Sequence, residues 1–590
     1  MKEIIIGIDL GTTNSAVAYV KDGVPRIIPI DGQPTMPSCV GLDPSGKLLV
    51  GTAARNMLTV APESTVLSVK RLMGQTTRIQ LGKESFSPEE ISSFILQRLK
   101  QEAEAFLGVP IHKAVVTVPA FFDESQRKAT KDAGSLAGLE IVRIINEPTA
   151  AALAYSAGKS EKERVLVYDL GGGTFDVSVV LIENGVVEVN ASRGDMHLGG
   201  DDFDQLLVEH VKQLFQKKEG MPLEIDLKTG RRLKLSLERA KCQLTDAPYA
   251  KVEEEYIRQD HHLQLELERH TFEQLIKPLL QKTLQCVHQS IRDAGISVRD
   301  LSKVLLVGGA TRSPVVHRLL QESLGMEPRS EVNPDLIVAL GASVCAAAIA
   351  GEPSHAILVD IAAHTLSLGV LHESNDGPEI RCSPILRRNT PLPSTKSELY
   401  HTVSYNQETV VIEVYEGEGR YPEENTLVGS FKVNGLARLP MGNPVVATLS
   451  LDLSGLLRVT AMEKITGLSK TVTMDTHQKG TSFDIEAARA NVQRILSQNS
   501  PALALATPRP ETAAKAGGGP AEPLNEPLLA EAKDLRRRAE TLLAGKLTPE
   551  DAADVREHLL QSTAAIEAGD WQKLKDHTDA LSDLVFYLED

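Results

Sequence analysis

The sequence predicts a multidomain protein: an α/β domain comes first, followed by an antiparallel β-sandwich and a small α-helical bundle. Up to about residue 355, apolar β-branched runs alternate with amphipathic helical segments, as in a largely parallel sheet covered by helices. Residues 366–475 form short alternating runs broken by Asn, Gly and Pro, which is typical of a sandwich. Three amphipathic segments within residues 528–590 predict the terminal helices.

The connecting segments differ in character. Residues 356–365 contain the apolar run AILVDIAAH, which is too hydrophobic for a flexible linker, so we expect it to dock on a neighbouring surface. Residues 476–498 contain the start of a further helix, which begins near Ser482. Residues 499–527 are rich in Pro, Ala and Gly, and this composition predicts a disordered tether.

Composition narrows the class of protein. The chain has 63 Lys and Arg against 79 Asp and Glu, a net charge of −16, which is the wrong sign for binding nucleic acid or an anionic membrane. None of the five cysteines forms a CxxC pair, which fits free thiols in a reducing compartment. The first residues lack the pattern of a signal peptide. We therefore expect a cytoplasmic and mainly monomeric protein.

Local signals place individual helices. A capping box at residues 87–90 opens a helix that ends near Gly108, and residues 123–126 open another. The uncharged run at residues 336–351 is shorter than the ~20 apolar residues of a membrane-spanning helix. It follows Asn333-Pro334, an N-cap with Pro at the first helical position, so we expect a buried helix to begin there.

The most informative motif occurs twice, as IIIGIDLGTTNS at residues 4–15 and VLVYDLGGGTFD at residues 165–176. In each copy an apolar strand ends in Asp-Leu-Gly, and Gly or Thr residues lead into a second strand. Such a turn presents free backbone N–H groups and hydroxyls to a phosphate. Asp9 and Asp169 could hold a hydrated divalent cation or orient a water. The alternative is a pair of tight hairpins with acidic caps, but the duplication favours a two-lobed phosphate site.

Other motifs carry less weight. The run VLLVGGATRSP at residues 304–314 also follows a buried strand, and its glycines would let a nucleotide approach while Arg312 stacks on the base. Residues 41–47 fit GxxxxGK but lack the following Ser or Thr, so we interpret them as a β-turn between strands. His261 and His262 have no further ligand at metal spacing and are predicted to be exposed loop residues.

Eight motifs, in order and at domain-scale spacing, resemble the seventy-kilodalton heat-shock protein chaperone family of the DnaK type. They are IGIDLGTTNS, VKRLMG, VTVPAFFDESQRKATKDAG, RIINEPTAAALAY, DLGGGTFDVS, GDMHLGGDDFD, LERAKCQLT and LLVGGATRSP. The resemblance implies an actin-like (ribonuclease H-like), two-lobed ATPase domain at residues 1–355. A linker at 356–365, a peptide-binding sandwich at 366–475 and the start of a lid helix at 476–498 would follow.

The same resemblance implies binding of ATP or ADP with Mg²⁺, and K⁺ as a candidate second cation. The residues that it makes catalytic are Lys70, Asp169, Thr174, Glu147 and Asp9, with Asp9 and Asp169 also holding Mg²⁺ through water. The residues that would bind the phosphates are Gly11, Thr12, Thr13, Gly172 and Gly173. The residues that would bind adenosine are Glu238, Lys241, Thr245, Gly308, Gly309 and Arg312. Thr245 stands where the family usually has Ser. Alone, Lys70 would be interpreted as a solvated lysine.

In the sandwich, the resemblance implies a pocket for an apolar side chain of an extended peptide. Its lining would be Val370, Tyr400, Val410 and Ile412, with Val403 and Glu373 at an arch over it. Ordinary core residues are the alternative. Three features depart from the family: the linker is two residues longer before LSLG, the segment from Gly74 to Ser87 is shorter, and the lid helix is cut at Asn499.

The sequence thus predicts an ATP-dependent molecular chaperone of protein folding and stress response, an ATPase whose slow hydrolysis is coupled to capture and release of unfolded peptides. The alternatives are a specialised paralogue with a narrow client range, an exchange factor with little hydrolysis, and a small-molecule kinase on the same fold. A J-domain cochaperone would engage Arg143, Asn146 and Thr149. A nucleotide exchange factor is a further candidate partner.

Overall fold

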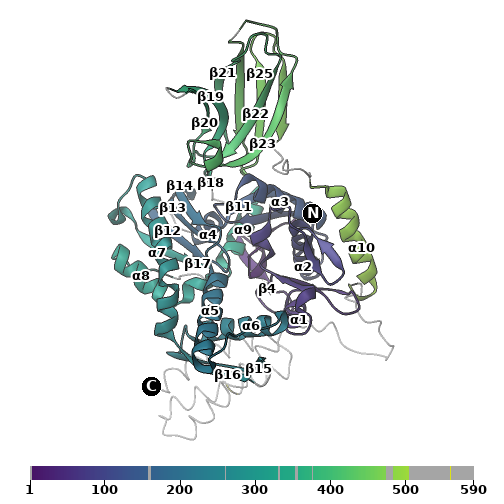
Figure 1. Cartoon of the computed structure of the whole chain (residues 1–590), viewed down its shortest axis with the longest axis vertical. Coiled ribbons are helices and arrows are strands. Elements are labelled where there is room, and N and C mark those ends of the chain that lie inside the picture. Colours follow the sequence, from purple (N-terminus) through teal and green to yellow (C-terminus); the bar gives the residue numbers. More distant parts are fainter. Residues whose placement is uncertain are drawn as a thin grey trace. The chain divides into compact units, whose positions relative to one another are not determined.

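Two β-sheets, each with both parallel and antiparallel strands, organise the first part of the chain (Figure 1). The computed structural model describes residues 3–156, 161–258, 261–329, 333–352, 357–374, 377–440, 442–473, 483–503 and Leu559. The chain divides into two units, Met1–Leu505 and Ala506–Asp590. The predicted terminal bundle and most of the predicted tether therefore lie outside the described residues.

The first sheet has the order β11-β10-β1-β2-β3, and β4 pairs with β2. β1 runs parallel to β10 and antiparallel to β2. Its strands are β1 (Ile5–Asp9), β2 (Asn14–Lys21), β3 (Val24–Ile28), β4 (Met36–Pro37), β10 (Lys113–Val118) and β11 (Glu140–Asn146). The predicted strand, turn and second strand of the first motif are thus confirmed as β1 and β2.

The second sheet repeats this arrangement in the order β17-β12-β13-β14-β18. β12 runs antiparallel to β13 and parallel to β17. Its strands are β12 (Glu163–Leu170), β13 (Phe175–Glu183), β14 (Val186–Asp195), β17 (Lys303–Val307) and β18 (Ile357–Val359). β12 and β13 therefore correspond to β1 and β2, which explains in structural terms why the glycine-rich motif occurs twice.

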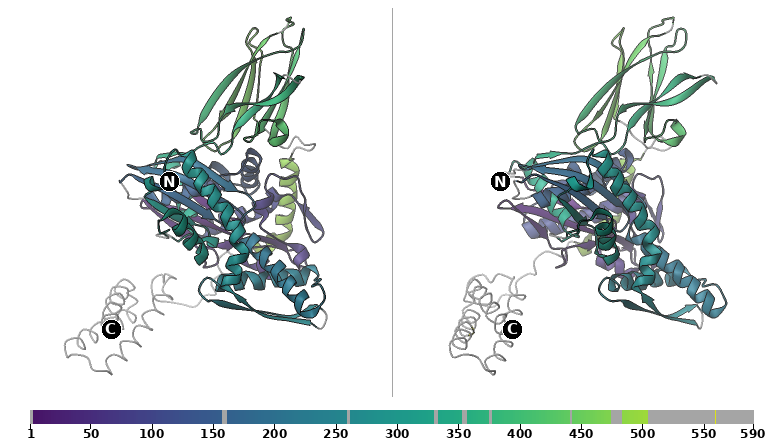
Figure 2. Two further views of the ribbon diagram at one scale, coloured as in Figure 1. Left: turned by 60° about the vertical axis from the view of Figure 1, so that its left-hand side comes forward. Right: turned by 90° about the vertical axis from the view of Figure 1, so that its left-hand side faces the viewer.

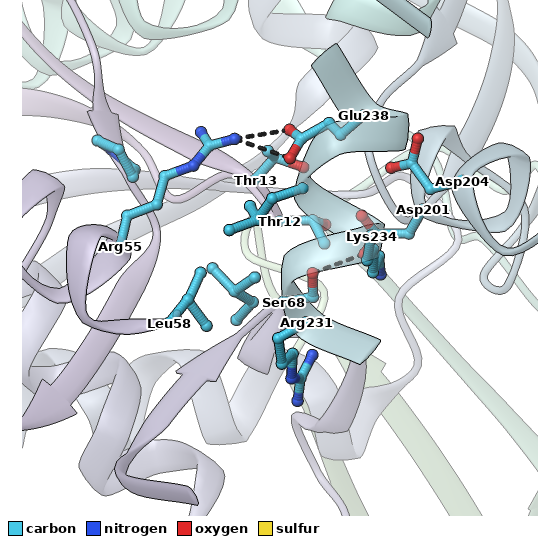
Figure 3. A pocket seen from close by; sticks show the side chains of 13 residues that line it. Thr12, Thr13, Arg55, Leu58, Ser68, Asp201, Asp204, Arg231, Lys234 and Glu238 are labelled. Carbon is cyan, nitrogen blue, oxygen red and sulfur yellow. Dashed lines mark hydrogen bonds and ion pairs between the residues drawn. The ribbon is translucent and has the colours of Figure 1, made fainter. Parts of the chain in front are cut away.

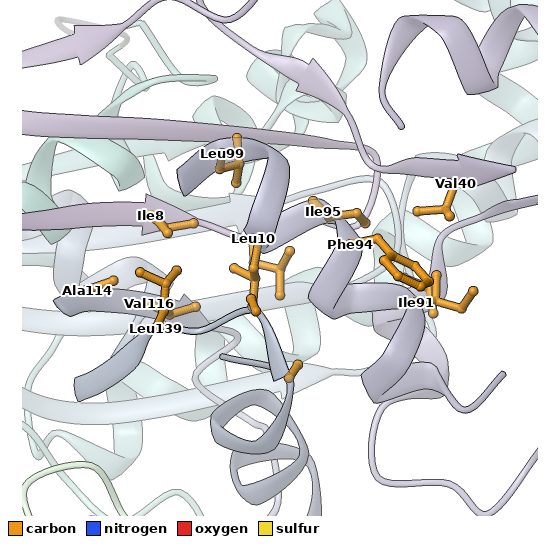
Figure 4. Packing of buried hydrophobic residues seen from close by; sticks show 14 of the residues in the cluster. Ile8, Leu10, Val40, Ile91, Phe94, Ile95, Leu99, Ala114, Val116 and Leu139 are labelled. Carbon is orange, nitrogen blue, oxygen red and sulfur yellow. The ribbon is translucent and has the colours of Figure 1, made fainter. Parts of the chain in front are cut away.

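Helices cover both sheets, and two of them begin where the capping signals predict. α2 (Pro88–Leu107) has the capping box of Ser87 and Glu90 and ends at Gly108, and α3 (Glu124–Leu136) is capped by Asp123. α2 buries an apolar stripe against the first sheet: Phe94, Ile95 and Leu99 belong to the same buried cluster as Ile8 and Val116, and Leu99 lies nearest to Ile8 in Figure 4. Burial of each such side chain contributes roughly 1.5–3 kcal/mol.

Further small elements extend each lobe. The first carries β5 (Cys39–Leu42), β6 (Leu48–Val50), β7 (Thr65–Leu67), the hairpin β8 (Ile79–Leu81) and β9 (Glu84–Phe86), and α1 (Thr52–Met57). The second carries α5 (Gly200–Glu219), α6 (Leu227–Gln243), α7 (Arg269–Asp293), α8 (Pro314–Leu324), and the hairpin β15 (Tyr249–Arg258) and β16 (His261–Glu268). The turn predicted at residues 41–47 is confirmed, since Gly46 N donates to Asp43 O (2.8 Å).

Two predictions about this region are wrong in detail. His261 and His262 lie in strand β16 rather than in a loop, because the hairpin with β15 continues through a register shift. The buried helix does not begin at Pro334: residues after Asn333 form a turn, and α9 (Ile337–Ile349) starts later. The burial predicted for that helix is confirmed, since nine of its residues are buried. No helix among the described residues is long and apolar enough to cross a membrane.

The two sheets meet through two small-residue helices, α4 (Glu147–Ser156) and α9. One buried cluster joins residues of both helices to residues of both sheets. Their backbones approach so closely that a Cβ atom on Gly341 of α9 would lie 1.7 Å from Ala150 O of α4. The contact between the lobes thus requires a residue without a side chain.

The predicted sandwich is confirmed. One sheet has the order β20-β19-β22-β23 and the other β21-β24-β25-β26, with all pairs antiparallel, and both layers are visible in Figure 2. Both sheets contribute to a single core, for example through Val414 and Val459. The strands are β19 (Leu366–Ser374), β20 (Gly377–Leu386), β21 (Ser394–His401), β22 (Thr409–Glu416), β23 (Thr426–Asn434), β24 (Pro444–Leu451), β25 (Leu457–Glu463) and β26 (Ser469–Thr473).

The apolar linker is docked, as the sequence predicts. β18 adds to the second sheet as a parallel strand beside β14, with Ile357 opposite Val186 and Val359 opposite Glu188. Asp360 follows and is buried, and its carboxylate accepts two hydrogen bonds of 2.9 Å from Asn146 Nδ2. The linker therefore binds both lobes, through backbone pairing on one and a buried side chain on the other.

Helix α10 (Ile485–Leu503) packs on the first lobe. Val492 and Ile495 are buried in the same cluster as the core of that lobe. Arg494 donates to both oxygens of Glu84 in the short hairpin, at 3.2 and 2.5 Å. The helix extends to Leu503, beyond the end predicted at residue 498.

The packing of α4 on α9 predicts opposite outcomes for two helical glycines. Replacement of Gly341 by Ala forces a Cβ into the backbone of α4, so the free energy of unfolding falls by roughly 1–3 kcal/mol. In the control Gly230→Ala, the new Cβ lies 3.6 Å from Ile225, and the gain in helix propensity raises stability by up to about 1 kcal/mol. Urea titration measures both, and equal stability of the two variants would contradict this packing.

Candidate functional site

The two glycine turns face each other in direct contact. A Cβ atom on Gly172 would lie 1.8 Å from Thr13 Oγ1, and one on Gly173 would lie 2.6 Å from Thr12 Cγ2. Gly172 and Gly173 follow β12, whereas Thr12 and Thr13 follow β1. The equivalent turns of the two repeated sheets are therefore brought together, as the duplication predicts. Their N–H groups and hydroxyls line the same place between the lobes.

A third turn joins them. Gly308 has a φ of +82°, and a Cβ on it would lie 2.4 Å from Leu170 O and 2.8 Å from Asp169 Oδ1. A left-handed backbone and contact with the neighbouring strand both require glycine there. The run at residues 308–312 thus begins in contact with the end of β12, next to the duplicated turns. It continues as a 3₁₀ turn over Gly309–Arg312.

One lysine lies among four carboxyl groups at this junction. The ammonium of Lys70, which is 4% exposed, is ion-paired with the carboxylate of Glu147 at the start of α4. Asp9 accepts a 3.0 Å hydrogen bond from Thr117 Oγ1. Asp169 and Asp176 are paired opposite each other in β12 and β13. The predicted catalytic residues Lys70, Asp9, Glu147 and Asp169 are thus brought to one buried place.

The single positive charge of Lys70 does not balance the negative charge that the four carboxyl groups would carry. Burial and then the charge of Glu147 raise the pKa of Asp9 to about 7. The same two causes, in the same order, raise the pKa of Asp176 to about 8, and burial raises the pKa of Asp169 well above its ordinary value. Each shift means that the negative form is disfavoured until positive charge enters. The site is built to receive a cation.

The residues present fit a hydrated Mg²⁺. Among the residues that the structure describes, no three or more His, Cys, Asp or Glu side chains are grouped to hold a metal directly. Mg²⁺ commonly keeps several waters and binds through one or two carboxylates and substrate phosphates. Asp169, which is buried, and Asp9, which is half-buried, are short of positive charge and match that mode.

A cavity beside the turns is lined by residues of both lobes (Figure 3). Its lining includes Thr12, Thr13 and Glu238. Across it, Arg55 of α1 donates to both oxygens of Glu238 in α6 at 2.8 Å. Ser68 Oγ donates to Asp201 Oδ2 at 2.6 Å. The two lobes are therefore joined on this side by an ion pair and a hydrogen bond.

A second cavity, of about 410 Å³, is within the size range of small-molecule sites. Its lining includes Lys241, Cys242, Thr245, Gly309 and Arg312. The residues predicted to bind adenosine are therefore divided, because Glu238 lines the first cavity and the others named here line the second. The spacing of Glu238, Lys241 and Thr245 in the sequence would put all three on one face of a helix, but α6 ends at Gln243, so Thr245 follows the helix that carries the other two.

Side chains around these cavities are already oriented by neighbours. Lys241 Nζ lies 2.7 Å from Asp204 Oδ1, and Arg312 donates to Asp335 at 2.6 Å. Of the remaining predicted residues, Thr174 is buried, and Gly11 lies in a turn so tight that a Cβ would fall 2.0 Å from Asn14 O. The positions of Thr174 and Gly11 agree with the prediction that these turns bind a ligand.

Sequence reasoning missed two residues of the site. Asp176 accepts the backbone N–H groups of Ala120 and Phe121, each at 3.2 Å, and so connects the second sheet to the first lobe. It belongs to the quoted motif DLGGGTFD, and its position opposite Asp169 in a hairpin could have drawn attention to it. Arg55 has no local signal, since its partner Glu238 lies 183 residues away.

The predicted peptide-binding residues lie in the sandwich core. Ile412 is buried in the apolar cluster, and Val370, Tyr400 and Val410 pack against that cluster half-buried. The hydroxyl of Tyr400 donates to Ser383 Oγ at 3.0 Å. Val403 is 51% exposed. The structure brings four of these five residues together and leaves Val403 outside the buried cluster.

Comparison with known proteins gives consistent matches. The family model described as Hsp70 protein matches residues 5–583. Proteins described as Chaperone protein DnaK from Thermotoga neapolitana, Thermotoga petrophila and Thermotoga maritima are each 41% identical over 514 residues. Each match covers 84% of this chain and 85% of the relative.

The contact between the glycine turns predicts a specific loss of nucleotide binding. In Gly172→Ala, the new Cβ overlaps Thr13 Oγ1 and pushes the turns apart, so nucleotide affinity falls by at least tenfold, about 1.4 kcal/mol. In the control Gly171→Ala, the nearest atom is Thr174 O at 3.6 Å, and affinity stays within about threefold. Isothermal titration calorimetry with ADP measures both. Equal affinities would contradict the facing arrangement.

Proposed function

The chain belongs to the Hsp70 family of ATP-dependent chaperones, and from this premise we propose how its residues bind ATP, hydrolyse it and transmit the result to a peptide-binding sandwich. The observation that supports this best is the meeting of three glycine turns around a buried lysine and an excess of carboxyl groups. That combination binds a polyanion and a cation together, which is what an ATPase requires.

We assign the phosphates to the turns at Thr12, Thr13, Gly172 and Gly173. Their N–H groups and hydroxyls are the donors, and Mg²⁺, held through water by Asp9 and Asp169, supplies neutralising charge when bound. Lys70 donates to the transferring phosphate. Hydrolysis depends mainly on positioning and charge neutralisation, so these parts are sufficient.

Asp169 is the residue that we propose to orient the attacking water and accept its proton. Burial supports this role, because it raises the pKa of Asp169 and so increases the basicity of its carboxylate. Glu147 holds Lys70 in place and begins α4, which packs between the lobes. Thr174, at the end of the second turn, completes this set. Adenosine is assigned to the second cavity, with Lys241, Thr245, Gly308, Gly309 and Arg312, and to Glu238, which lines the first cavity.

Loss of Lys70 should separate hydrolysis from binding. In Lys70→Ala the transferring phosphate loses its buried ammonium, so single-turnover hydrolysis of ATP falls by at least a hundredfold, about 2.7 kcal/mol, while nucleotide still binds. Lys113→Ala removes an exposed lysine whose partner is Glu3 and serves as the control with normal turnover. Turnover of Lys70→Ala at the wild-type rate would contradict the assignment.

We propose that the linker couples hydrolysis to peptide binding. A ligand shifts a conformational equilibrium only through different affinity for the two states, so ATP must favour one placement of β18. The docked placement pairs β18 with β14 of the second lobe. It also brings Asp360 to Asn146, which precedes α4, and to Thr149, which lies in α4. Closure of the lobes around ATP favours this placement, and the ADP state releases it.

Asp360→Ala tests the coupling. It removes the acceptor of Asn146, so an unfolded peptide should no longer stimulate the ATPase rate, while the unstimulated rate changes less than about threefold. Asp360→Asn keeps one acceptor oxygen and should retain part of the stimulation. The measurement is steady-state ATPase with and without peptide. Full stimulation in Asp360→Ala would exclude coupling through this residue.

We further propose the finer features that the family implies. Extended apolar peptides bind at Val370, Tyr400, Val403, Val410 and Ile412. A J-domain cochaperone binds at Arg143, Asn146 and Thr149, where two of the three contact Asp360 of the docked linker. A nucleotide exchange factor, K⁺ as a second cation and a cytoplasmic location complete the proposal.

A further inference from the structure

The docked sandwich meets the first lobe through two glutamates. Glu124 lies in the first turn of α3 and Glu416 at the end of β22. Glu124 N donates to Glu416 Oε2 at 3.5 Å, and Leu457 N of the sandwich donates to Glu124 Oε1 at 3.1 Å. Glu124 is 4% exposed. The contact therefore joins the backbone of Glu124, whose side chain is buried, to the carboxyl group of Glu416, which is half-buried.

The other oxygen of Glu124 lacks a donor. Its Oε2 is buried, and no described residue forms a hydrogen bond with it. The nearby cation Arg127 does not fill this place, because its guanidinium donates to Phe122 O, Ala120 O, Asn146 Oδ1 and Ser454 O. A buried carboxylate oxygen without a donor is costly, and protonation of the carboxyl group lowers this cost because it removes the unpaired negative charge.

A histidine completes the contact from the linker. His364 belongs to the stretch that is two residues longer than usual, and its ring packs edge-on against Phe121 with centroids 4.4 Å apart. Its Nε2 lies 3.1 Å from Phe121 O, so this nitrogen carries a proton and donates. The electrostatic interaction with His364 lowers the pKa of both Asp123 and Glu416, against the larger effect of burial.

The titratable and charged groups around the contact have an excess of negative charge. From α3 and its cap come Asp123, Glu124 and Arg127. From the sandwich come Glu416 and Asp452, and from the linker His364. Four carboxyl groups thus oppose one permanent cation and one imidazole. The cluster approaches neutrality only by taking up protons.

The directions of the pKa shifts agree with this geometry. Burial raises the pKa of Glu124 well above its ordinary value, and Glu416 and Asp452 raise it further against the lowering effects of Leu457 N–H and Arg127. Burial also raises the pKa of Glu416, with a further increase from Asp123 and decreases from His364 and Arg127. Burial outweighs the same two cations at Asp123, whose pKa is also raised.

We propose that the Glu124–Glu416 contact is an acid-stabilised latch, which takes up a proton when the sandwich docks on α3 and releases it when the sandwich leaves. Separation returns both glutamates to water, where their ordinary pKa values apply. A group whose pKa is raised in the docked state stabilises docking below that raised pKa, and the contribution is lost as pH rises through it. Docking is therefore strengthened by acidification.

A second contact, between the sandwich and the second lobe, serves as an internal reference. Asp293 of α7 accepts from Arg193 of β14 and from Arg388 of the sandwich, at 2.9 and 2.5 Å. These hydrogen bonds hold the pKa of Asp293 below its ordinary value, so this contact is already ionised at pH 6 and does not change up to pH 8. Asp360 is buried with a raised pKa and acts in the same direction as the latch, so variants are needed to separate the two.

Hydrogen exchange of the linker measures docking in the full chain with ATP. Ile357 N donates to Gly185 O when β18 is docked, so its amide is protected. The exchange rates are first corrected for the intrinsic effect of pH on exchange. Protection of residues 357–361 should then fall by roughly tenfold to a hundredfold from pH 6 to pH 8, because uptake of one proton on docking changes the docking equilibrium by up to about tenfold per pH unit. Protection that is independent of pH would overturn the proposal.

Glu124→Gln and Glu416→Gln identify the groups responsible. Each amide resembles the neutral acid, so either variant should remain docked at pH 8 and lose most of the pH dependence. Glu423→Gln removes an exposed charge from the same sandwich and should behave as wild type. The two variants change opposite sides of the contact, so the test still stands if one of them misfolds. Circular dichroism detects such misfolding. Wild-type pH dependence in both folded variants would overturn the latch.

The proposal requires docking and separation of the sandwich but not ATP hydrolysis. Linker protection that is the same with and without ATP at pH 6 would count against the coupling proposed above. A pH dependence that persists in that case would still support the latch, because the proton uptake is a property of the contact itself.

Discussion

The close approach of backbone turns between the two lobes is the constraint on which the rest of the structure depends. Between the lobes, Gly172 meets Thr13 at a distance that leaves no room for a Cβ atom, and Gly341 of α9 meets the backbone of α4 in the same way. Within the second sheet, Gly308 meets the backbone of Leu170 just as closely. Because each contact brings the backbone of a glycine against its neighbour, these contacts fix the relative position of the lobes more tightly than flexible side chains could. Any ligand bound at the turns must therefore report on the position of both lobes.

The same constraint connects the chemistry of the site to the sandwich. Asp176 lies opposite Asp169 and binds the backbone of Phe121, and the ring of Phe121 contacts His364 in the linker. Asp360 of the linker, in turn, binds Asn146 just before Glu147, the partner of Lys70. Two short paths of contacts thus join the carboxyl groups of the site to the docked segment. Both paths consist of packed or hydrogen-bonded groups in the docked arrangement.

The sequence was a good guide where the signal is local. The capping box at residues 87–90 fixes α2, because it depends only on neighbours in the chain. Each Asp-Leu-Gly turn is also a local signal, and its repetition predicts the facing turns because it marks corresponding strand ends of the two sheets. It was a poor guide where partners are distant: Arg55 is held by a residue of another lobe, and the environment of Glu124 is set by the sandwich. The start of α9 was misplaced because a turn after Asn333 outweighs a favourable capping signal. Residue types alone do not reveal such contacts.

The most direct test of the account is a crystal structure of the full chain with Mg²⁺ and a non-hydrolysable ATP analogue. The account predicts that the triphosphate lies between Thr12–Thr13 and Gly172–Gly173, within reach of Lys70, while β18 stays paired with β14. Nucleotide bound elsewhere with the turns in contact and empty, or a triphosphate at the turns that leaves Lys70 on the far side of Glu147, would contradict it.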